Sequence, residues 1–273
     1  MKLFLRRLVS RPWLQTVWRQ GLKLSMAGLN IGGGYGFDSS GEINVLHRLQ
    51  RLCAMQDTAV IVDVGAHRGE YAAAVLRVIG NKAVIHCCEP DPVAFAALDT
   101  RFAARPAVHC HQTALGESDG TGWLITDHPG STTGSVETGG RSPVGERQIS
   151  ARIRRLEEFC GENRIARIDL LKLDVEGYEY DVLKGAGRML SGGRISLIQF
   201  EFGETYIRYR RYLRDIFDLL SAEYRIYRVL QNGFAEVKSY SPEEEIFKIT
   251  NFMAVCRRAD NTAPQSPTSA NVF

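Results

Sequence analysis

The chain has 273 residues, of which 44% are hydrophobic and 24% are charged, as is typical of a globular protein with one large core. Its formal net charge of +3 is too small to indicate nucleic-acid binding by itself. The six cysteines form no CxxC pair, which favours buried thiols in a reducing compartment. No apolar run approaches the roughly 18 residues that a membrane-spanning helix needs.

The first 28 residues are basic and amphipathic. They carry six Lys or Arg side chains and no acid, interleaved with Leu and Trp, and the arginines interrupt the apolar run too often for a signal peptide. Residues 1–45 are therefore predicted to extend from the main domain. Two interpretations remain open: a helix that packs on the main domain or on the partner in a homo-oligomer, or a segment that touches an anionic membrane surface.

From residue 59 onward, apolar runs alternate with helical segments. Strands are predicted at residues 59–66, 83–90 and 107–116, and helices at residues 70–80 and 91–104. Gly80 is placed to end the first helix, while Asp91 as N-cap and Pro92 in the first turn begin the second. Strands that alternate with helices of this length predict parallel βαβ units and an α/β fold.

The alternation lapses over residues 120–146, a stretch rich in Gly, Ser, Thr and Pro in which we predict one strand and a long loop. It resumes with strands predicted at residues 148–153, 168–174 and 194–203 and helices at residues 155–165, 178–186 and 204–223. Residues 224–230 and 247–258 predict a closing antiparallel pair at the edge of the sheet. One domain is therefore expected over residues 46–258, followed by a disordered polar tail over residues 259–273.

The stretch VDVGAHRGEY, residues 62–71, predicts a strand, a glycine turn and a helix start. Gly65 lets the backbone approach a ligand, and Gly69 lets the helix begin tightly, with free amides that favour electron-rich groups. The spacing is G-x-x-x-G and not the G-x-G-x-x-G of dinucleotide binders. Glu89 ends the next strand, 20 residues beyond Gly69, where an acid accepts hydrogen bonds from ribose hydroxyls in nucleotide-binding α/β folds.

The stretch IDLLKLDVEGYEYDVLKGA, residues 168–186, predicts a buried strand that runs into carboxylates. Asp174 and Glu176 follow the strand, and Glu201 at the end of the next strand should converge on the same crevice. Two roles stay open for these acids: one is a general base with a raised pKa, and the other is a set of two or three ligands for Mg²⁺. Glu179 is expected to be a charge in the first turn of a helix.

Together these motifs resemble the class I S-adenosylmethionine-dependent methyltransferases and, more narrowly, the FkbM family. The resemblance covers about residues 59–256 and rests on VDVGAHRGEY, EPDP, TALG, RLEEF, IDLLKLDVEGYEYDVLKGA and LIQFEF, in that order. The sequence departs from the family pattern at His67 and Arg68, beside the amino acid end of the cofactor, and at Thr113.

The resemblance implies a doubly wound, mostly parallel, seven-stranded Rossmann-like methyltransferase sheet with an antiparallel edge strand. It also implies methyl transfer from S-adenosylmethionine to a hydroxyl of a sugar, a glycan or a glycosylated natural product. The implied cofactor-binding residues are Asp63, Gly65, Ala66, Gly69, Tyr71, Glu89, Pro90, Ala114 and Leu115. The implied catalytic acids are Asp174, Glu176 and Glu201, which are also the candidate metal ligands.

The acceptor is expected to be a small molecule or a glycan and not nucleic acid. His128 and Ser135 flank a loop rich in hydroxyls, and Tyr206 begins a segment of interleaved aromatic and basic residues that suits sugars, so these three residues are predicted to bind the acceptor. Two other functions remain open: a NAD(P)-dependent oxidoreductase, which the missing G-x-G-x-x-G disfavours, and a non-catalytic binding protein that kept the fold. The protein is expected in the cytoplasm, with membrane association left open.

Overall fold

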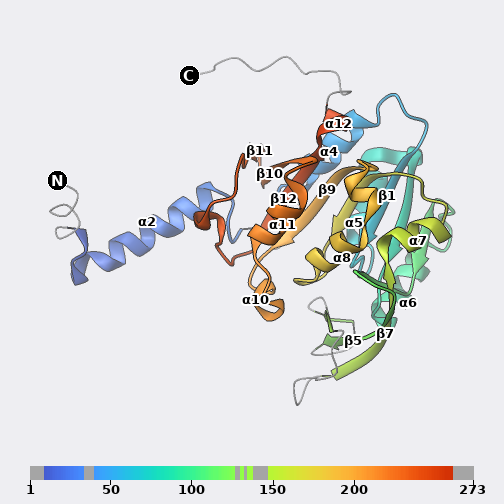
Figure 1. The fold of residues 1–273 in the computed structure, drawn as a ribbon, viewed down its shortest axis with the longest axis horizontal. Helices are drawn as coiled ribbons and strands as arrows, with labels where there is room; N and C mark the ends of the chain where they lie inside the picture. Colours follow the sequence, from blue (N-terminus) through green and yellow to red (C-terminus); the bar gives the residue numbers. More distant parts are fainter. Residues whose placement is uncertain (1–8, 34–39, 127–129, 132–133, 138–146, 261–273) are drawn as a thin grey trace.

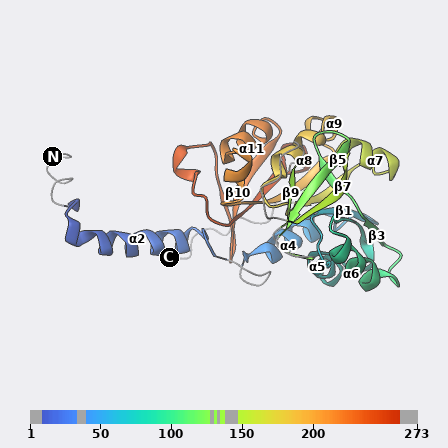
Figure 2. The ribbon, with the colours of Figure 1, turned by 90° about the horizontal axis from the view of Figure 1, so that it is seen from below.

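The chain forms two β-sheets, a large central sheet with helices on both faces and a smaller sheet beside it (Figures 1 and 2). The computed structural model describes residues 9–33, 40–126, 130–131, 134–137 and 147–260. The strands of the central sheet are β1 (Ala59–Val64), β2 (Ala83–Cys88), β3 (Val108–His111), β8 (Ile168–Leu173), β9 (Ile195–Phe202), β10 (Tyr224–Leu230), β11 (Gly233–Glu236) and β12 (Thr250–Cys256). Their order across the sheet is β11-β10-β12-β9-β8-β1-β2-β3.

The central sheet is parallel from β9 to β3, and β12 is inserted antiparallel between β9 and β10. The predicted mostly parallel α/β sheet with an antiparallel edge is therefore confirmed, although it has eight strands and not seven. The additional strand is β11, which pairs with β10 across a tight turn between Leu230 and Gly233. The four residues Gly233–Glu236 are too few to show a strand period in the sequence.

Helices cover both faces of the central sheet, as a doubly wound fold requires (Figure 2). One face is covered by α4 (Glu42–Leu52), α5 (Glu70–Ile79) and α6 (Pro92–Phe102), and the other by α7 (Leu156–Glu162), α8 (Glu179–Gly185), α9 (Arg188–Ser191) and α11 (Leu213–Leu220). The shorter or peripheral helices are η1 (Pro12–Leu14), α2 (Gln15–Gly28), η2 (Gly80–Lys82), α10 (Tyr206–Tyr209), η3 (Pro242–Glu244) and α12 (Arg257–Asp260). Because both faces are covered, all six residues of β8 are buried.

The predicted helix boundaries beside the first strands are confirmed. Asp91 caps α6, because its Oδ1 accepts hydrogen bonds from the amides of Val93 at 2.7 Å and Ala94 at 2.9 Å. Gly80 follows the last residue of α5 with a φ of 70°, a conformation that glycine adopts without steric cost.

The smaller sheet corrects two predictions. It consists of β4 (Ala114–Gly116), β7 (Arg147–Arg155), β5 (Gly120–Thr126) and β6 (Ser135–Glu137), in that order. The single strand predicted over residues 107–116 is in fact divided, because the chain leaves the central sheet after His111 and Thr113 Oγ1 donates a hydrogen bond to the Arg152 carbonyl of β7 at 3.1 Å. Residues 120–146 hold a second strand, β6, in addition to the predicted one.

The long helix predicted over residues 204–223 is also two helices, α10 and α11. The chain breaks at Arg210, which has a positive φ of 53°, and Tyr212 is extended. The free amides at the start of α11 are satisfied by acids: Asp215 accepts from the Tyr212 amide at 2.9 Å, and Glu245 accepts from the next two amides at 3.1 and 3.0 Å. A distant carboxylate therefore supports a helix start that the local sequence pattern did not predict.

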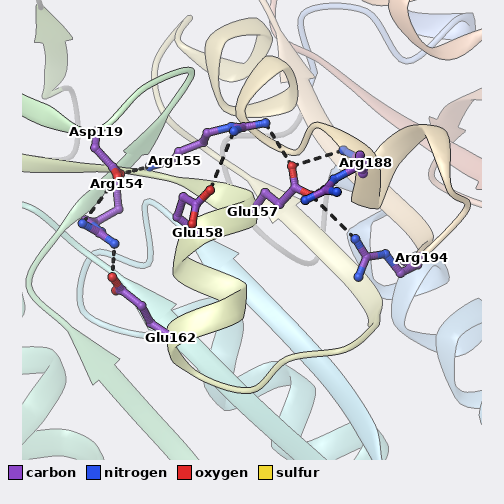
Figure 3. Close-up of polar contacts among 8 residues, drawn as sticks. All are labelled: Asp119, Arg154, Arg155, Glu157, Glu158, Glu162, Arg188 and Arg194. Carbon is purple, nitrogen blue, oxygen red and sulfur yellow. Dashed lines mark hydrogen bonds and ion pairs between the residues drawn. The ribbon is translucent and has the colours of Figure 1, made fainter.

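An ion-pair network fastens β7 to α7 and α9 (Figure 3). Glu157, at the start of α7, accepts a hydrogen bond from Arg155 at 2.9 Å and one from Arg188 Nε at 3.0 Å, and its Oε1 lies 3.7 Å from Arg194. Arg154 pairs with Glu162 at the other end of α7. Such a connected network contributes more than isolated surface pairs, so it helps to hold the smaller sheet against this helical layer.

The helix α2 projects away from the body of the molecule, and none of its residues is buried (Figures 1 and 2). The chain rejoins the body directly afterwards, where the Asn30 side chain donates to the Val229 carbonyl at 2.9 Å and the Gly32 amide donates to Ile249 at 2.8 Å. The next helix, α4, begins at Glu42, inside the predicted extension of residues 1–45, and packs on the central sheet. Among the described helices, none is long and apolar enough to cross a membrane.

Candidate active site

A cleft opens at the carboxyl ends of β1, β2 and β8, the edge where parallel α/β sheets bind ligands. Leu124 of β5 and Val136 of β6, in the smaller sheet, contribute to its wall. The cleft spans about 560 Å³ of space, which includes open solvent at its mouth. Seven of the predicted residues line it: Gly65, Glu89, Pro90, Ala114, Leu115, Asp174 and Glu176.

The turn after β1 brings the backbone of three strands together. Gly65 has a φ of 81°, and its amide donates to the Cys88 carbonyl of β2 at 2.9 Å. A Cβ on Gly65 would lie 1.8 Å from the Asp174 carbonyl oxygen, so the turn needs glycine for contact with the loop after β8 and not only for a ligand. Gly69 needs glycine for packing, because a Cβ there would lie 2.4 Å from the Phe102 ring of α6.

Glu89 is held rigidly at the end of β2. Its Oε2 accepts a hydrogen bond from the His67 amide at 2.8 Å, and its Oε1 accepts one from the Asp91 amide at 2.8 Å. Burial raises the pKa of Glu89, and these two amide donors oppose the rise. Each carboxylate oxygen keeps further acceptor capacity, so Glu89 can accept hydrogen bonds from a ligand in the cleft.

Lys172 is the centre of a buried charge cluster behind the cleft. Its Nζ lies 3.1 Å from Asp174 Oδ2 and 3.6 Å from Glu42 Oε1. Glu42 Oε1 also accepts from Gln199 Nε2 at 2.6 Å, and Gln199 Oε1 accepts from the Tyr71 hydroxyl at 2.6 Å. Burial by itself would lower the pKa of Lys172, but the surrounding carboxylates, with Asp174 first, raise it overall. The ammonium therefore stays charged and fixes the Asp174 side chain.

The loop after β8 turns sharply at Glu176 and Gly177. Glu176 has a positive φ of 55°, which is uncommon for a residue other than glycine, and Gly177 follows with a φ of 99°. A Cβ on Gly177 would lie 2.7 Å from the Thr205 carbonyl oxygen, so α10 approaches this loop closely. Burial first, and then the negative charge of Asp174, raise the pKa of Glu176 to about 7. Glu176 is thus a half-buried carboxylate on the cleft wall that titrates near neutral pH.

Two further acids flank this loop. Glu179 lies in the first turn of α8, as predicted. It is buried there, and its Oε1 accepts from the Val175 amide at 3.1 Å and closes the turn. Burial raises the pKa of Glu179 to about 8. Burial also raises the pKa of Glu201, on β9, to about 8; Asp174 adds to this rise and Lys172 opposes it. Glu201 therefore belongs to the same electrostatic cluster but does not line the cleft.

The acids of this cluster do not fit a metal site. Within the described ranges, no group of three or more His, Cys, Asp or Glu side chains is arranged to hold a metal ion. The Lys172 ammonium already lies against Asp174 and Glu42, where a divalent cation would compete for the same carboxylate oxygens. The Mg²⁺ alternative for Asp174, Glu176 and Glu201 therefore has no support in their geometry.

Other predicted cofactor residues lie beneath the cleft and not on its wall. Asp63 is buried at the end of β1, where its Oδ2 has no hydrogen-bond partner within the described part of the chain. Burial raises the pKa of Asp63 to about 7, and Lys172 opposes this rise. Tyr71 belongs to the Lys172 cluster through its hydroxyl, and the buried Ala66 donates its amide to the Cys88 carbonyl at 3.1 Å.

Of the predicted acceptor residues, Tyr206 does not lie on the cleft. Tyr206 is 1% exposed, and its ring packs on Phe202 in the core. Ser135 is the first residue of β6, and His128 lies outside the described residues.

The cleft wall also contains His67 and Thr113, where the sequence departs from the family pattern, and five residues that the predicted site does not include: Asp91, Ser131, Gly134, Val136 and Tyr178. Three of them, Ser131, Gly134 and Val136, belong to the long segment between β5 and β7, which carries no periodic pattern. Tyr178 ends the acidic loop and lies on the cleft next to Glu176. Its position after Gly177 is a local signal that could have identified it.

Comparison with known proteins gives one family and a small group of relatives. The family model described as the methyltransferase FkbM domain matches residues 63–229. The chain is 31% identical over 176 residues to the 2-O-methyltransferase NoeI of Sinorhizobium fredii, a match that covers 59% of this chain and 70% of NoeI. It is 28% identical over 147 residues to Methyltransferase 1 of Beauveria bassiana, which covers 47% of this chain and 59% of that protein.

Among solved structures, the chain is similar to methyltransferase FkbM from Methylobacillus flagellatus KT. The TM-score is 0.47 at 19% identity, and the match covers 72% of this chain but 44% of the longer structure.

Proposed function

Because the chain belongs to the FkbM family of methyltransferases and is an S-adenosylmethionine-dependent enzyme, we propose that it methylates a hydroxyl oxygen of a sugar, a glycan or a glycosylated natural product. The observation that carries this proposal is the cleft itself, where Glu89 stands at the end of β2 and Glu176 on the loop after β8. One acid is thus available on the cofactor side and another on the acceptor side of a single site.

The cleft offers groups that fit the cofactor. Glu89 would accept hydrogen bonds from the ribose hydroxyls, and the buried Ala114 and Leu115 would provide apolar surface for the adenine. The Asp63 oxygen that the described chain leaves unsatisfied is a further acceptor beneath the turn after β1. S-adenosylmethionine, when bound, supplies the methyl group on a sulfonium sulfur that is a good leaving group.

Glu176 is the proposed general base. A sugar hydroxyl is a weak acid, so its oxygen becomes a better nucleophile when a carboxylate accepts its proton. A pKa of about 7 suits this task near neutral pH, because the carboxylate is then both available and sufficiently basic. Asp174 is the proposed positioning group: its Oδ2 is fixed at 3.1 Å from Lys172, and its negative charge keeps the Glu176 pKa high. Glu201 would act at longer range through the same electrostatic cluster.

The proposed acceptor class rests on two observations. The relative NoeI is by name a 2-O-methyltransferase, which makes oxygen the favoured acceptor atom here. The acceptor side of the cleft is partly open and carries polar groups, Ser131 and Tyr178 among them, beside the apolar Leu124 and Val136. A mixed wall of this kind can contact both the hydroxyls and the apolar face of a sugar ring.

The test is transfer of a deuterated methyl group from labelled S-adenosylmethionine into glycan and glycolipid extracts. We expect the label in a monosaccharide O-methyl ether that survives acid hydrolysis and is identified by mass spectrometry. Label that is found only in protein, nucleic acid or base-labile esters would contradict the proposed acceptor class.

Two controls test the alternatives. Calorimetry with S-adenosylhomocysteine and with NAD should give binding of the first compound alone, and binding of NAD alone would favour an oxidoreductase. Activity in excess EDTA should equal activity in Mg²⁺. A loss of turnover in EDTA that Mg²⁺ restores would instead assign a metal to the reaction.

A further inference from the structure

We propose that the projecting helix α2 (Gln15–Gly28) is a membrane-surface anchor that lies on anionic lipid headgroups. Neither the family nor the cleft explains this helix, which lies outside the matched residues 63–229 and contributes no residue to the cleft.

The helix exposes an apolar face that nothing in the described structure covers. The side chains with large exposed fractions are Trp13 at 71%, Val17 at 56%, Trp18 at 48%, Leu22 at 58%, Leu24 at 76% and Leu29 at 45%. Within α2, the period of 3.6 residues places Val17, Trp18, Leu22 and Leu24 on one half of the cylinder. Trp13 belongs to η1 directly before the helix, and Leu29 follows its last residue. An exposed apolar stripe with two tryptophans is typical of a helix that lies in the headgroup layer of a bilayer.

The opposite face of α2 is polar and purely basic. Gln15, Arg19 and Lys23 succeed one another at intervals of four residues, away from the apolar stripe. The first acid of the sequence is Asp38, so no carboxylate on the helix neutralises these cations. At the base of the helix, Lys23 and Lys248 line a common groove, together with Glu204 and the apolar Met26 and Ile31. The groove therefore adds one further lysine next to the helix, beside one acid of the body.

This charge pattern favours a lipid surface over a second copy of the chain. Two α2 helices paired through their apolar faces would bury the stripe but would leave Arg19 and Lys23 pointing outward, with no acid on either helix to neutralise them. Anionic headgroups instead satisfy the apolar stripe and the cations at once. The 14 residues of α2 make a helix of about 21 Å, and its cations also suit a position on the membrane and not across it.

The attachment of α2 to the body gives the anchor a function. The hydrogen bonds of Asn30 to Val229 and of Gly32 to Ile249 tie the chain to the central sheet directly after the helix. A bound helix would therefore hold the enzyme close to the membrane and not at the end of a long tether.

The test is co-sedimentation of the full chain with vesicles, together with tryptophan fluorescence. We expect binding to vesicles of phosphatidylcholine with phosphatidylglycerol, a blue shift of the emission, and weaker binding as salt rises. Binding to pure phosphatidylcholine should be much weaker. Equal binding to both vesicles, or no binding to either, would overturn the proposal.

Matched variants separate the two faces of the helix. The double variant Arg19→Gln with Lys23→Gln should weaken vesicle binding about ten- to thirtyfold, because each of the two cations adds to the attraction between the helix and an anionic surface. Trp13→Ala with Trp18→Ala should abolish the blue shift. The control for the cations is the double variant Arg105→Gln with Lys238→Gln, because both side chains are exposed away from α2. The control for the tryptophans is Trp123→Ala, because this side chain on β5 is 43% exposed. Both controls should bind vesicles as the parent does. Light scattering without lipid gives an independent outcome. If the parent protein is a dimer and the double variant Trp13→Ala with Trp18→Ala is a monomer, a second copy covers the apolar face, and this result would refute the anchor.

Discussion

At the scale of single residues, the loop after β8 gives two neighbouring carboxylates different environments. Asp174 forms an ion pair with the buried Lys172 at 3.1 Å, whereas burial raises the pKa of Glu176 to about 7 on the cleft wall. In active sites where two carboxyl groups have different environments, the group with the raised pKa commonly carries out the proton transfer. If Glu176 is the general base, the reaction rate should depend on pH as its carboxyl group loses its proton.

Glu176→Gln should lower kcat by about 10²- to 10⁴-fold, the usual contribution of a general base, and should leave cofactor affinity nearly unchanged. In the parent enzyme, kcat/KM should rise with pH through about 7, because the base must lose its proton. The rate of the variant should lack this rise. Initial rates with labelled cofactor across pH test both points. Glu158→Gln, an exposed acid on α7, is the control, and a parent-like pH profile in Glu176→Gln would exclude this residue as the base.

Glu89→Gln should weaken S-adenosylhomocysteine binding by about 10- to 100-fold, since hydrogen bonds to a charged acceptor contribute more than neutral ones. Part of the loss will come from the turn that Glu89 holds through the His67 and Asp91 amides. Calorimetry measures the affinity for S-adenosylhomocysteine, and a thermal melt shows whether the loss of the turn has destabilised the fold. Glu70→Gln, an exposed acid at the start of α5, should bind as the parent does. Unchanged affinity in Glu89→Gln would remove the ribose-binding role.

The part of the cleft at the ends of β1 and β2 could be predicted from the sequence, while the part beneath the smaller sheet could not. Glu89 and Gly65 are recognisable because each follows a strand whose place in the sheet is clear from the βαβ alternation. Val136 and Ser131 line the cleft only because the smaller sheet folds over it. Tyr206 illustrates the opposite error: its aromatic and basic neighbours suggested an exposed sugar platform, but the ring is buried against Phe202.

At the scale of elements, the contact between α8 and β4 joins the acidic loop to the smaller sheet. A Cβ on Gly185 of α8 would lie 1.9 Å from the Gly116 carbonyl oxygen of β4, so the helix touches the strand backbone directly. This contact fixes the distance between the Glu176 loop and one wall of the cleft. The predicted strand 107–116 is divided because its second part, β4, pairs with β7 and packs on α8. β4 therefore does not continue beside β2 in the central sheet.

Gly185→Ala should destabilise the protein by about 2–4 kcal/mol, because neither backbone can move without disturbing a sheet. Gly161→Ala is the matched control: this helical glycine, in α7, has no neighbour within 4 Å of an added Cβ. The control should be neutral or up to about 1 kcal/mol more stable, through reduced entropy of the unfolded chain. Urea unfolding measures both variants. Equal stabilities would show that α8 and β4 are not rigidly packed.

Helices and strands with a clear hydrophobic period were predicted well. Elements whose bounds depend on residues far along the chain were not. The strands β1, β2, β8 and β9 are predominantly apolar and largely buried, as is typical of parallel strands covered on both faces. The break between α10 and α11 depends on Glu245, which lies far along the chain and satisfies the amides at the start of α11. A local pattern cannot show such a cap.

At the scale of the whole molecule, buried acids make stability depend on pH. The pKa values of Asp63 and Glu176 rise to about 7, and those of Glu179 and Glu201 to about 8, all by burial first. Because the folded state holds these protons more tightly than the unfolded chain, this contribution is complete below about pH 4 and is lost as pH rises through 7 to 8. Burial lowers the pKa of His86 to about 4, and this contribution is lost as pH falls from about 6.5 to 4.

The melting temperature should therefore be highest near pH 4 to 5 and should fall by roughly 5 °C or more by pH 8, because four acids lose their stabilising protons over this range while only one histidine acts in the opposite direction. Thermal melts in buffers of constant ionic strength test this. Glu201→Gln should flatten the alkaline decline, because the side chain no longer ionises in the folded state. A melting temperature that rises steadily from pH 6 to 9 would contradict the buried, protonated acids.

The position of β12 has a consequence for biosynthesis. This strand lies between β9 and β10 although it is the last strand of the sheet to be made, so the ribosome delivers both neighbours before the strand that joins them. Until Thr250–Cys256 emerges, β9 keeps an open apolar edge and the β10–β11 hairpin has no place in the sheet. Open edges of this kind pair readily with other chains. The nascent protein is consequently most prone to aggregation just before its last strand closes the sheet, and truncations or stalls within residues 231–256 should require chaperones most.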